Sequence, residues 1–274
     1  MIGILNGVVD DVDNIKVSPL SRAYTFGDAV YEVIPYAYGF VHLNSHINRL
    51  LNSCKQMYIP TSKEVIEQDL ALLMESQDNI AYGYVYYQIT KGVDMDRGHV
   101  WHTGTSSPER FGFIKEADLS PKDPKSLFLY PDIRWNRCDI KTTGLTGNVL
   151  ALAKANKGGY DDVLFKKGEW ITECSASNIF LVQNDCVLTP KLNFDILEGI
   201  TRTEIFRLCY ANGIHIEEGN YTETDLYSSD AVFQTSSISG IRKISKVNDT
   251  EFDLNNPVVE KLQRLYFKEL NLVV

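Results

Sequence analysis

A polar segment with two prolines divides the chain and limits the folds that are open to it. Residues 118–125 place Pro121 and Pro124 among charged and small residues, which is the composition of a linker. With 274 residues, 44% of them hydrophobic, the chain is long enough to bury a core on each side of this segment. The sequence therefore predicts two domains, a small one over 1–117 and a larger one over 126–274, joined by the linker.

Strand-like and helical segments alternate in the first half. β-branched and aromatic residues predict strands over residues 2–8, 30–40, 82–90 and 111–115. Apolar residues at helical spacing predict two helices, one capped by Asn44 and one that begins at the capping-box pattern of residues 61–64. The remaining segments, 21–32 and 92–104, are predicted loops. The second loop holds Asp94, Asp96, Arg97, His99 and His102, and is either a recognition element or an exposed polar loop.

The second half is richer in strands. They are predicted over residues 126–131, 162–165, 169–172, 179–182, 186–188 and 232–235. One helix is expected to end at Gly158-Gly159, one to begin at a capping box formed by Thr201 and Glu204, and one to begin at Asn256 and Pro257. This mixture predicts an α/β (α+β) protein whose C-terminal domain is β-rich.

Charge and cysteine usage exclude several classes of function. The formal net charge is −9 and no basic patch is found, which argues against binding to nucleic acid or to an anionic membrane. No apolar run reaches the roughly 18 to 20 residues that span a bilayer. The five cysteines are far apart and form no C-x-x-C pair, so neither a disulfide framework nor a metal centre is expected. These features predict a cytoplasmic protein.

Three short segments are candidates for chemistry. Lys141 follows an apolar-polar alternation and precedes Thr142-Thr143-Gly144, where a desolvated lysine would lose its proton more readily and offer an amine for Schiff-base formation. A solvated strand-end lysine is the alternative. Gly199-Ile200-Thr201 opens a helix, so its backbone N–H groups could bind an anion, although an ordinary helix cap has the same pattern. Residues 236–240 offer hydroxyls and flexible backbone donors after a strand.

Five motifs in one order along the chain carry a family resemblance. They cover residues 22–32, 46–50, 137–141, 173–180 and 199–202. Together they resemble the fold-type IV pyridoxal 5′-phosphate (PLP) enzymes, the family of D-amino-acid aminotransferases, branched-chain aminotransferases and aminodeoxychorismate lyases. The resemblance covers nearly the whole chain. It implies a two-domain fold with the PLP site at the domain interface, and a homodimer.

The resemblance also implies roles for individual residues. Lys141 is similar to the lysine that binds PLP covalently and moves the substrate proton, and Glu173 to the acid that pairs with the pyridine nitrogen. Leu197 would pack on the pyridine ring. The 5′-phosphate would be held by Arg49, by the backbone of Ile200 and Thr201, and by the Ser237-Ile238 turn. Ile238 stands where some members have a threonine, and Ala176 where D-amino-acid aminotransferases have a serine.

On the substrate side, Arg97 and His99 resemble the pair that, with a tyrosine matching Tyr31, binds the α-carboxylate in D-amino-acid aminotransferases. Asp94 and Asp96 flank Arg97 and could compete for its guanidinium. The resemblance implies ping-pong transamination between D-amino acids of the D-alanine or D-glutamate type and 2-oxo acids, with 2-oxoglutarate or pyruvate as acceptor. The alternatives are a branched-chain L-amino-acid or (R)-amine aminotransferase, an aminodeoxychorismate lyase, and a non-catalytic homologue that binds PLP or another ligand.

Overall fold

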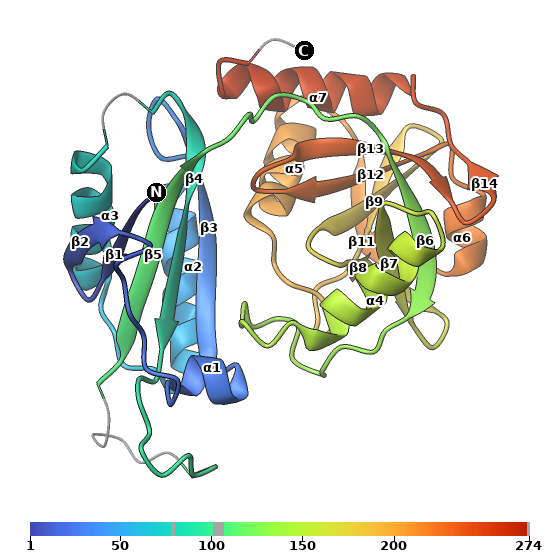
Figure 1. Ribbon diagram of the computed structural model, residues 1–274. Coiled ribbons are helices and arrows are strands. Elements are labelled where there is room, and N and C mark those ends of the chain that lie inside the picture. The colour runs from blue at the N-terminus through green and yellow to red at the C-terminus, as the bar shows by residue number, and fades with distance from the viewer. Residues whose placement is uncertain (78–79, 101–106, 273–274) are drawn as a thin grey trace. The chain divides into compact units, whose positions relative to one another are not determined.

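The protein consists of two compact units, each built around its own sheet (Figure 1). The computed structural model describes residues 1–77, 80–100 and 107–272. Unit 1 comprises Met1–Asp118 and Ile140–Leu145, and unit 2 comprises Leu119–Asp139 and Thr146–Val274. The chain leaves unit 1 at Asp118, where the predicted linker begins. Residues 140–145, which the sequence analysis placed in the second domain, belong to unit 1.

Unit 1 holds an antiparallel sheet with the strand order β2-β1-β5-β4-β3. Its strands are β1 (Ile2–Leu5), β2 (Val8–Asp11), β3 (Ala29–Ala37), β4 (Tyr82–Thr90) and β5 (Glu109–Glu116). The strand predicted over residues 2–8 is instead a hairpin, because Asn6 and Gly7 adopt positive φ angles of 52° and 84° and reverse the chain between β1 and β2.

The helices of unit 1 are α1 (Arg22–Phe26), α2 (Leu43–Gln56) and α3 (Lys63–Glu75). The short α1 lies within a predicted loop. The cap expected at Asn44 is wrong, because α2 follows His42, which has a left-handed backbone, whereas the predicted start of α3 is confirmed by Ser62. Helices α2 and α3 cover one face of the sheet, and their apolar residues share a core with strand residues such as Ile34 and Val85 (Figure 1).

The other face of the unit 1 sheet carries aromatic side chains from three neighbouring strands. The ring of Tyr86 stacks on that of Tyr31 with 5.5 Å between centroids, and on that of Phe113 with 5.2 Å. Each of the three lies between two buried residues of its strand, as the two-residue period of a strand requires. One face of the sheet therefore packs on helices, and the other presents a row of rings.

Unit 2 holds a larger, mixed sheet with the order β11-β10-β9-β12-β13-β6-β7-β8, and β14 pairs with β13. Its strands are β6 (Lys125–Pro131), β7 (Asp162–Lys167), β8 (Trp170–Cys174), β9 (Asn178–Gln183), β10 (Cys186–Pro190), β11 (Ile216–Gly219), β12 (Ala231–Ser236), β13 (Gly240–Val247) and β14 (Thr250–Glu251). The sheet curls, so that β8 at one end of the order also lies against β9 and β10. The strands β11, β13 and β14 are not among those predicted from the sequence.

The helices of unit 2 are α4 (Thr146–Lys157), α5 (Ile200–Ala211), α6 (Glu223–Tyr227) and α7 (Pro257–Glu269). α4 packs on β6 and β7, while α5 and α7 pack on each other and on β12 and β13. The predicted start of α7 is confirmed, since the Asn256 side chain accepts hydrogen bonds from the N–H groups of Val258 and Val259. The two units together confirm the predicted α/β fold class.

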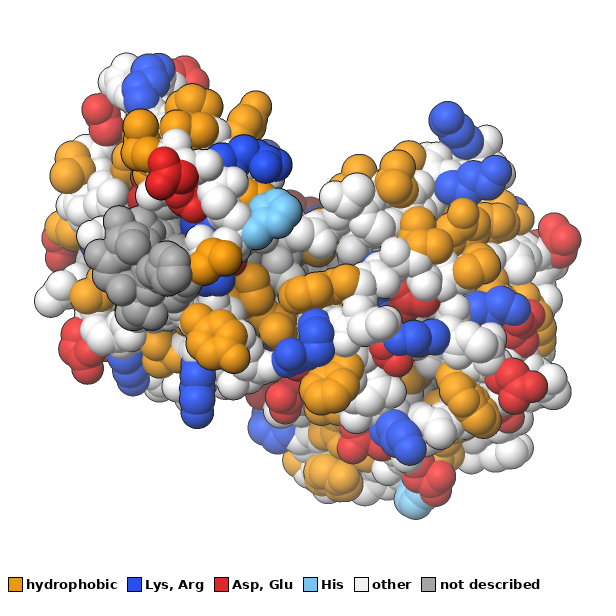
Figure 2. All heavy atoms as spheres, turned by 90° about the horizontal axis from the view of Figure 1, so that it is seen from below, with side chains coloured by type: hydrophobic (Ala, Val, Ile, Leu, Met, Phe, Trp, Pro, Cys, Tyr) orange, Lys and Arg blue, Asp and Glu red, His pale blue; other side chains and the backbone are white. Residues whose placement is uncertain are grey.

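Basic and acidic side chains are interspersed on the face of the molecule shown in Figure 2. In the described ranges, no helix is both long enough and apolar enough to cross a membrane. All five cysteines are free thiols.

Candidate active site

Lys141 lies on a short segment that pairs with β3. Its carbonyl oxygen accepts a hydrogen bond from the N–H of Tyr31 at 3.0 Å, and its own N–H donates to Ser53 Oγ at 3.3 Å. Thr143 N–H donates to the carbonyl of Ala29 at 3.0 Å. Because β3 is an edge strand of its sheet, the segment covers hydrogen-bonding groups that the edge would leave unpaired. The backbone of Lys141 is thereby fixed on both sides.

A close approach of two glycines allows this segment to reach β3. Gly27, which ends α1 with a left-handed φ of 65°, lies so near that a Cβ on it would be 3.2 Å from the Cα of Gly144. The hydroxyl of Thr143 donates to the Gly27 carbonyl at 3.2 Å. A side chain at position 27 would therefore strain the backbone and push the lysine segment away.

The Lys141 side chain extends over the aromatic face of the unit 1 sheet. Its Nζ lies 4.4 Å from the centroid of the Tyr31 ring, and Tyr31 in turn stacks on Tyr86. An ammonium group at this distance interacts favourably with the face of a ring. Lys141 is half-buried, so its amine is positioned by contacts and still accessible.

Arg49 is part of a buried charge cluster in unit 1. Its Nε and Nη2 donate to the two carboxylate oxygens of Glu32 at 2.7 and 2.8 Å, and Glu32 also contacts His46 Nδ1 at 2.8 Å. Burial alone would raise the pKa of Glu32, but Arg49 and His46 hold it well below its usual range. Burial lowers the pKa of His46. Arg49 thus forms a two-point ion pair with Glu32, and this pair fixes the guanidinium plane.

Arg97 and His99 come together on the ring of Phe26. The Arg97 guanidinium carbon lies 4.8 Å from the Phe26 centroid, and the His99 ring meets the same ring edge-on at 5.6 Å. Tyr31, the third member of the predicted carboxylate site, instead contacts Tyr86 and Lys141. His102 lies outside the described residues.

The competition expected from Asp94 is not seen. Asp94 Oδ2 accepts a hydrogen bond from Arg22 at 2.9 Å, and Asp94 Oδ1 accepts the N–H of Asp96 at 3.1 Å. Arg22 is buried and also binds Asp28. The Asp94 carboxylate, three residues before Arg97, is therefore committed to a different guanidinium.

Glu173 is the second-to-last residue of β8 in unit 2 and is almost fully buried, with 5% exposure. Its Oε1 accepts a hydrogen bond from Arg134 Nη1 at 2.5 Å, and its Oε2 accepts from Asn178 Nδ2 at 3.0 Å and from the Leu197 N–H at 3.2 Å. Burial raises the pKa of Glu173 to about 7, although Arg134 and the Leu197 N–H oppose the shift. A carboxylate offers about four acceptor positions, so one remains beyond these three bonds.

Sequence reasoning missed Arg134, which positions Glu173. Its side chain is buried, it forms a two-point ion pair with Asp132, and its guanidinium carbon lies 4.6 Å from the Phe165 ring centroid. Arg134 lies in an irregular stretch between β6 and α4, where no periodicity distinguishes one arginine from another. The nearby charged pair Arg137 and Asp139, which bind each other, look similar in the sequence.

The N-terminus of α5 is arranged differently from the predicted capping box. The cap residue is Gly199, which has no side chain to cap the helix, and Ile200 and Thr201 are its first two residues. Gly199 is required by its neighbour, because a Cβ there would collide with Asn178 Oδ1. The cap residue thus offers the first-turn N–H groups no side-chain acceptor, at the end of the helix where the dipole favours an anion.

The turn that holds Ser237 and Ile238 joins β12 to β13. Thr235, just before this turn, pairs across the sheet with Asn178, the residue that binds Glu173. Gln234 Oε1 and Thr235 Oγ1 are buried and have no hydrogen-bond partner within the described ranges. Unit 2 therefore combines a buried acid, an uncapped helix N-terminus and buried oxygens without a hydrogen-bond partner among the described residues. Asn178 contacts the first two, because it binds Glu173 and lies against Gly199 at the start of α5.

These features fit PLP. The acceptor position left on Glu173 suits a protonated ring nitrogen, whose charge would offset the cost of burying the carboxylate. The uncapped start of α5 suits a phosphate.

Comparisons with known proteins give the family. The model of the amino-transferase class IV family matches residues 29–247. The D-alanine aminotransferase of Listeria monocytogenes serotype 4b (strain F2365) is 33% identical, over 97% of this chain and 95% of that protein.

Two solved structures show the same fold. The branched-chain amino acid aminotransferase of Thermobaculum terrenum in its PLP form superimposes with a TM-score of 0.86 at 22% identity, over 98% of this chain and 93% of the other. A putative 4-amino-4-deoxychorismate lyase of Legionella pneumophila gives 0.82 at 25% identity, over 94% and 97%.

The chain belongs to the class IV aminotransferase family, and it is an enzyme of this PLP-dependent class. Within the family, D-alanine aminotransferases at about a third identity match nearly its whole length.

Proposed function

We propose that this enzyme binds PLP and transfers the amino group between D-amino acids of the D-alanine or D-glutamate type and 2-oxo acids, with pyruvate or 2-oxoglutarate as acceptor. The observation that supports this best is the commitment of Asp94 to Arg22, which leaves the Arg97–His99 pair on Phe26 available for a carboxylate. The full-length similarity to D-alanine aminotransferases points to the same substrates.

In this proposal each unit supplies some of the residues that bind the cofactor. Lys141 and Arg49 belong to unit 1, whereas Glu173, Leu197 and the first turn of α5 belong to unit 2. When bound, PLP supplies an electron sink for the substrate α-carbon. Arg49 and the N–H groups of Ile200 and Thr201 hold the phosphate, and the Ser237-Ile238 turn completes its site.

The chain's own residues account for the proton movements. Lys141 Nζ, held over the Tyr31 ring, is the amine that attaches the cofactor and then carries the α-proton of the substrate. Glu173, fixed by Arg134 and Asn178, keeps a proton at the ring nitrogen. Leu197 is attached through its backbone to both Glu173 and Asn178, so its side chain is positioned to pack on the ring.

Substrate orientation is assigned to Tyr31, Arg97 and His99. An arginine, an imidazole and a phenol are well suited to a carboxylate. The amino acid would bind through its α-carboxylate and present its α-proton to Lys141.

The first test is the purified enzyme itself. We expect visible absorbance from lysine-bound cofactor, bleaching by D-alanine but not by L-leucine or a chiral amine, and turnover that requires a 2-oxo acid. Lys141→Ala should abolish turnover. Bleaching by L-leucine in place of D-alanine would refute the substrate proposal, and pyruvate release without an acceptor would indicate a lyase.

The second test concerns Arg97. Arg97→Met should raise the KM for D-alanine by roughly 10- to 100-fold, because a charge-assisted hydrogen bond contributes about 1.5–3 kcal/mol. Arg264→Met, which removes an exposed arginine on α7, is the matched control and should leave the KM unchanged. An Arg97→Met enzyme with wild-type KM would contradict the assignment.

We also propose that the enzyme acts as a homodimer, as the family resemblance implies. Light scattering on the purified protein should give twice the mass of the 31.0 kDa chain. A monomer with full turnover would rule this out.

A further inference from the structure

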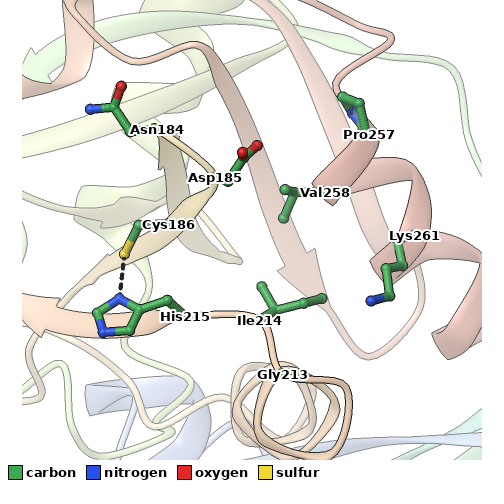
Figure 3. Close-up of a pocket in the computed structure, with 9 residues that line it drawn as sticks. All are labelled: Asn184, Asp185, Cys186, Gly213, Ile214, His215, Pro257, Val258 and Lys261. Atoms are coloured by element: carbon green, nitrogen blue, oxygen red, sulfur yellow. Dashed lines mark hydrogen bonds between the residues drawn. The ribbon is translucent and has the colours of Figure 1, made fainter.

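Three side chains with metal-binding atoms meet at one end of the unit 2 sheet. Cys186 Sγ lies 3.0 Å from His215 Nδ1, and His215 Nδ1 lies 3.5 Å from Glu217 Oε1 (Figure 3 shows the first pair). One atom from each of the three residues falls within 4.8 Å of the others. We call this group the β10–β11 cluster.

Strand pairing brings the three together. β10 and β11 are parallel with Val187 opposite Ile216, and the Val187 N–H donates to the His215 carbonyl at 2.9 Å. Cys186 and His215 are each one residue before that pair, so they are neighbours on one face. Glu217 is two residues after His215 and returns to the same face. The register of β10 and β11 therefore places the three side chains next to one another.

We propose that the β10–β11 cluster binds a divalent transition-metal ion of the zinc class, through Cys186 Sγ, His215 Nδ1 and Glu217 Oε1.

The donor set determines the kind of ion. Thiolate, imidazole and carboxylate are the three ligand types of zinc, whereas magnesium and calcium require mainly oxygen. Metal–ligand bonds of about 2.0–2.3 Å place tetrahedral ligands roughly 3.5 Å apart, close to the separations seen here. On binding, the Cys186 thiol gives its proton to solvent. Cys186 and His215 also line an open pocket of about 490 Å³, from which water could supply a fourth ligand (Figure 3).

The location favours a cation and a structural role. The chain runs from β10 through α5 to β11, so the cluster lies near the carboxyl end of α5, where the helix dipole is negative. The proposed phosphate-binding residues are at the other end of the same 12-residue helix. Asp185 also lines the pocket, and the cationic Lys261 directs its Nζ to the Asn212 carbonyl at 3.3 Å.

β11 is an edge strand and pairs only with β10 among the described strands. A metal bound to residues of both β10 and β11 would therefore stabilise the attachment of β11 to the sheet. No sequence pattern predicts this site, since Cys186 and His215 are 29 residues apart and follow no zinc-binding spacing.

The test is zinc titration of the reduced, PLP-loaded enzyme, free of any affinity tag, by calorimetry. We expect one site per chain. At a zinc concentration a hundred times its Kd, we expect a rise in Tm of roughly 5 °C, the size of shift that ligand binding at such saturation gives a protein of this length. Cobalt in place of zinc should give the visible absorbance of a tetrahedral thiolate complex.

Variants locate the site. Cys186→Ser and His215→Ala should each weaken zinc binding by at least about 100-fold, because even outer partners of a metal ligand are worth 10- to 100-fold. Cys138→Ser, which removes another half-buried thiol of unit 2, is the control and should bind zinc as the wild type does. Absence of zinc binding, or binding that Cys186→Ser does not change, would overturn the proposal. Neither result bears on transamination.

Discussion

Replacing Gly199 by alanine tests whether the buried acid and the start of α5 form one packed group. A Cβ at position 199 would collide with Asn178 Oδ1, while the backbone φ of −71° is ordinary, so the effect is steric and not conformational. To relieve the collision, Asn178 must move. Its Nδ2 would then lose the hydrogen bonds to Glu173 at 3.0 Å and to the Leu197 carbonyl at 2.8 Å.

The expected cost follows from these contacts. Overpacking a well-packed site costs about 1–3 kcal/mol, and a hydrogen bond to a charged group contributes about 1.5–3 kcal/mol. Because relaxation relieves part of the overlap, we expect Gly199→Ala to lower the free energy of unfolding by roughly 2–4 kcal/mol. Gly39→Ala is the control, since a Cβ there meets nothing within 4 Å, and it should change stability by about 0.5 kcal/mol or less.

A double-mutant cycle makes the test specific. Asn178→Ala removes both the hydrogen bonds and the atom that collides, so adding Gly199→Ala to it should cost little more. The two changes should therefore be non-additive by roughly 2 kcal/mol. Urea unfolding of the cofactor-free protein, followed by the fluorescence of Trp135 and Trp170 in unit 2, measures each variant. Additive costs, or a Gly199→Ala protein as stable as the wild type, would refute the reasoning.

Two further predictions concern pH. Burial raises the pKa of Glu173 from 4.5 to about 7, so the folded state binds this proton more tightly and stability is lost as pH rises through that window. The difference in unfolding free energy between the cofactor-free wild type and Glu173→Gln should change by roughly 3 kcal/mol between pH 4 and pH 8, and a constant difference would contradict this. His46 has the opposite sign. Its folded pKa lies below the ordinary 6.5, so its contribution is present above that value and is lost as pH falls below it. His46→Asn should flatten the decline of stability just below pH 6.5 in urea unfolding, and an unchanged slope would argue against the assignment.

Segments set by local patterns could be predicted from the sequence. The strand over Tyr82–Thr90 was predicted with its observed bounds, and α7 begins after Asn256 as expected, because a period-two pattern and a capping side chain act within a few residues. The start of α2 was missed because His42 adopts a left-handed φ of 51°, which no local rule required.

Features set by distant pairing could not be predicted. The sequence predicts Lys141 as the reactive residue but assigns its segment to the wrong unit, because the segment is held by contacts to Gly27 and Ala29 more than a hundred residues away. Arg134 was missed for the same reason, since its importance comes from Glu173, 39 residues later. Sequence motifs thus predict candidate residues, while long-range hydrogen bonds determine which groups surround them.

Asn178 positions both the buried acid Glu173 and the start of α5. One amide binds the carboxylate of Glu173 and the carbonyl of Leu197, and its oxygen lies where any side chain at Gly199 would have to be. The acid proposed for the ring nitrogen and the helix end proposed for the phosphate are therefore placed by a single side chain. The distance between two ends of a rigid cofactor cannot change, so a fixed spacing between their partners is what binding requires. Asn178 supplies that spacing from within the core of unit 2, which explains why it is buried and why Gly199 must remain a glycine.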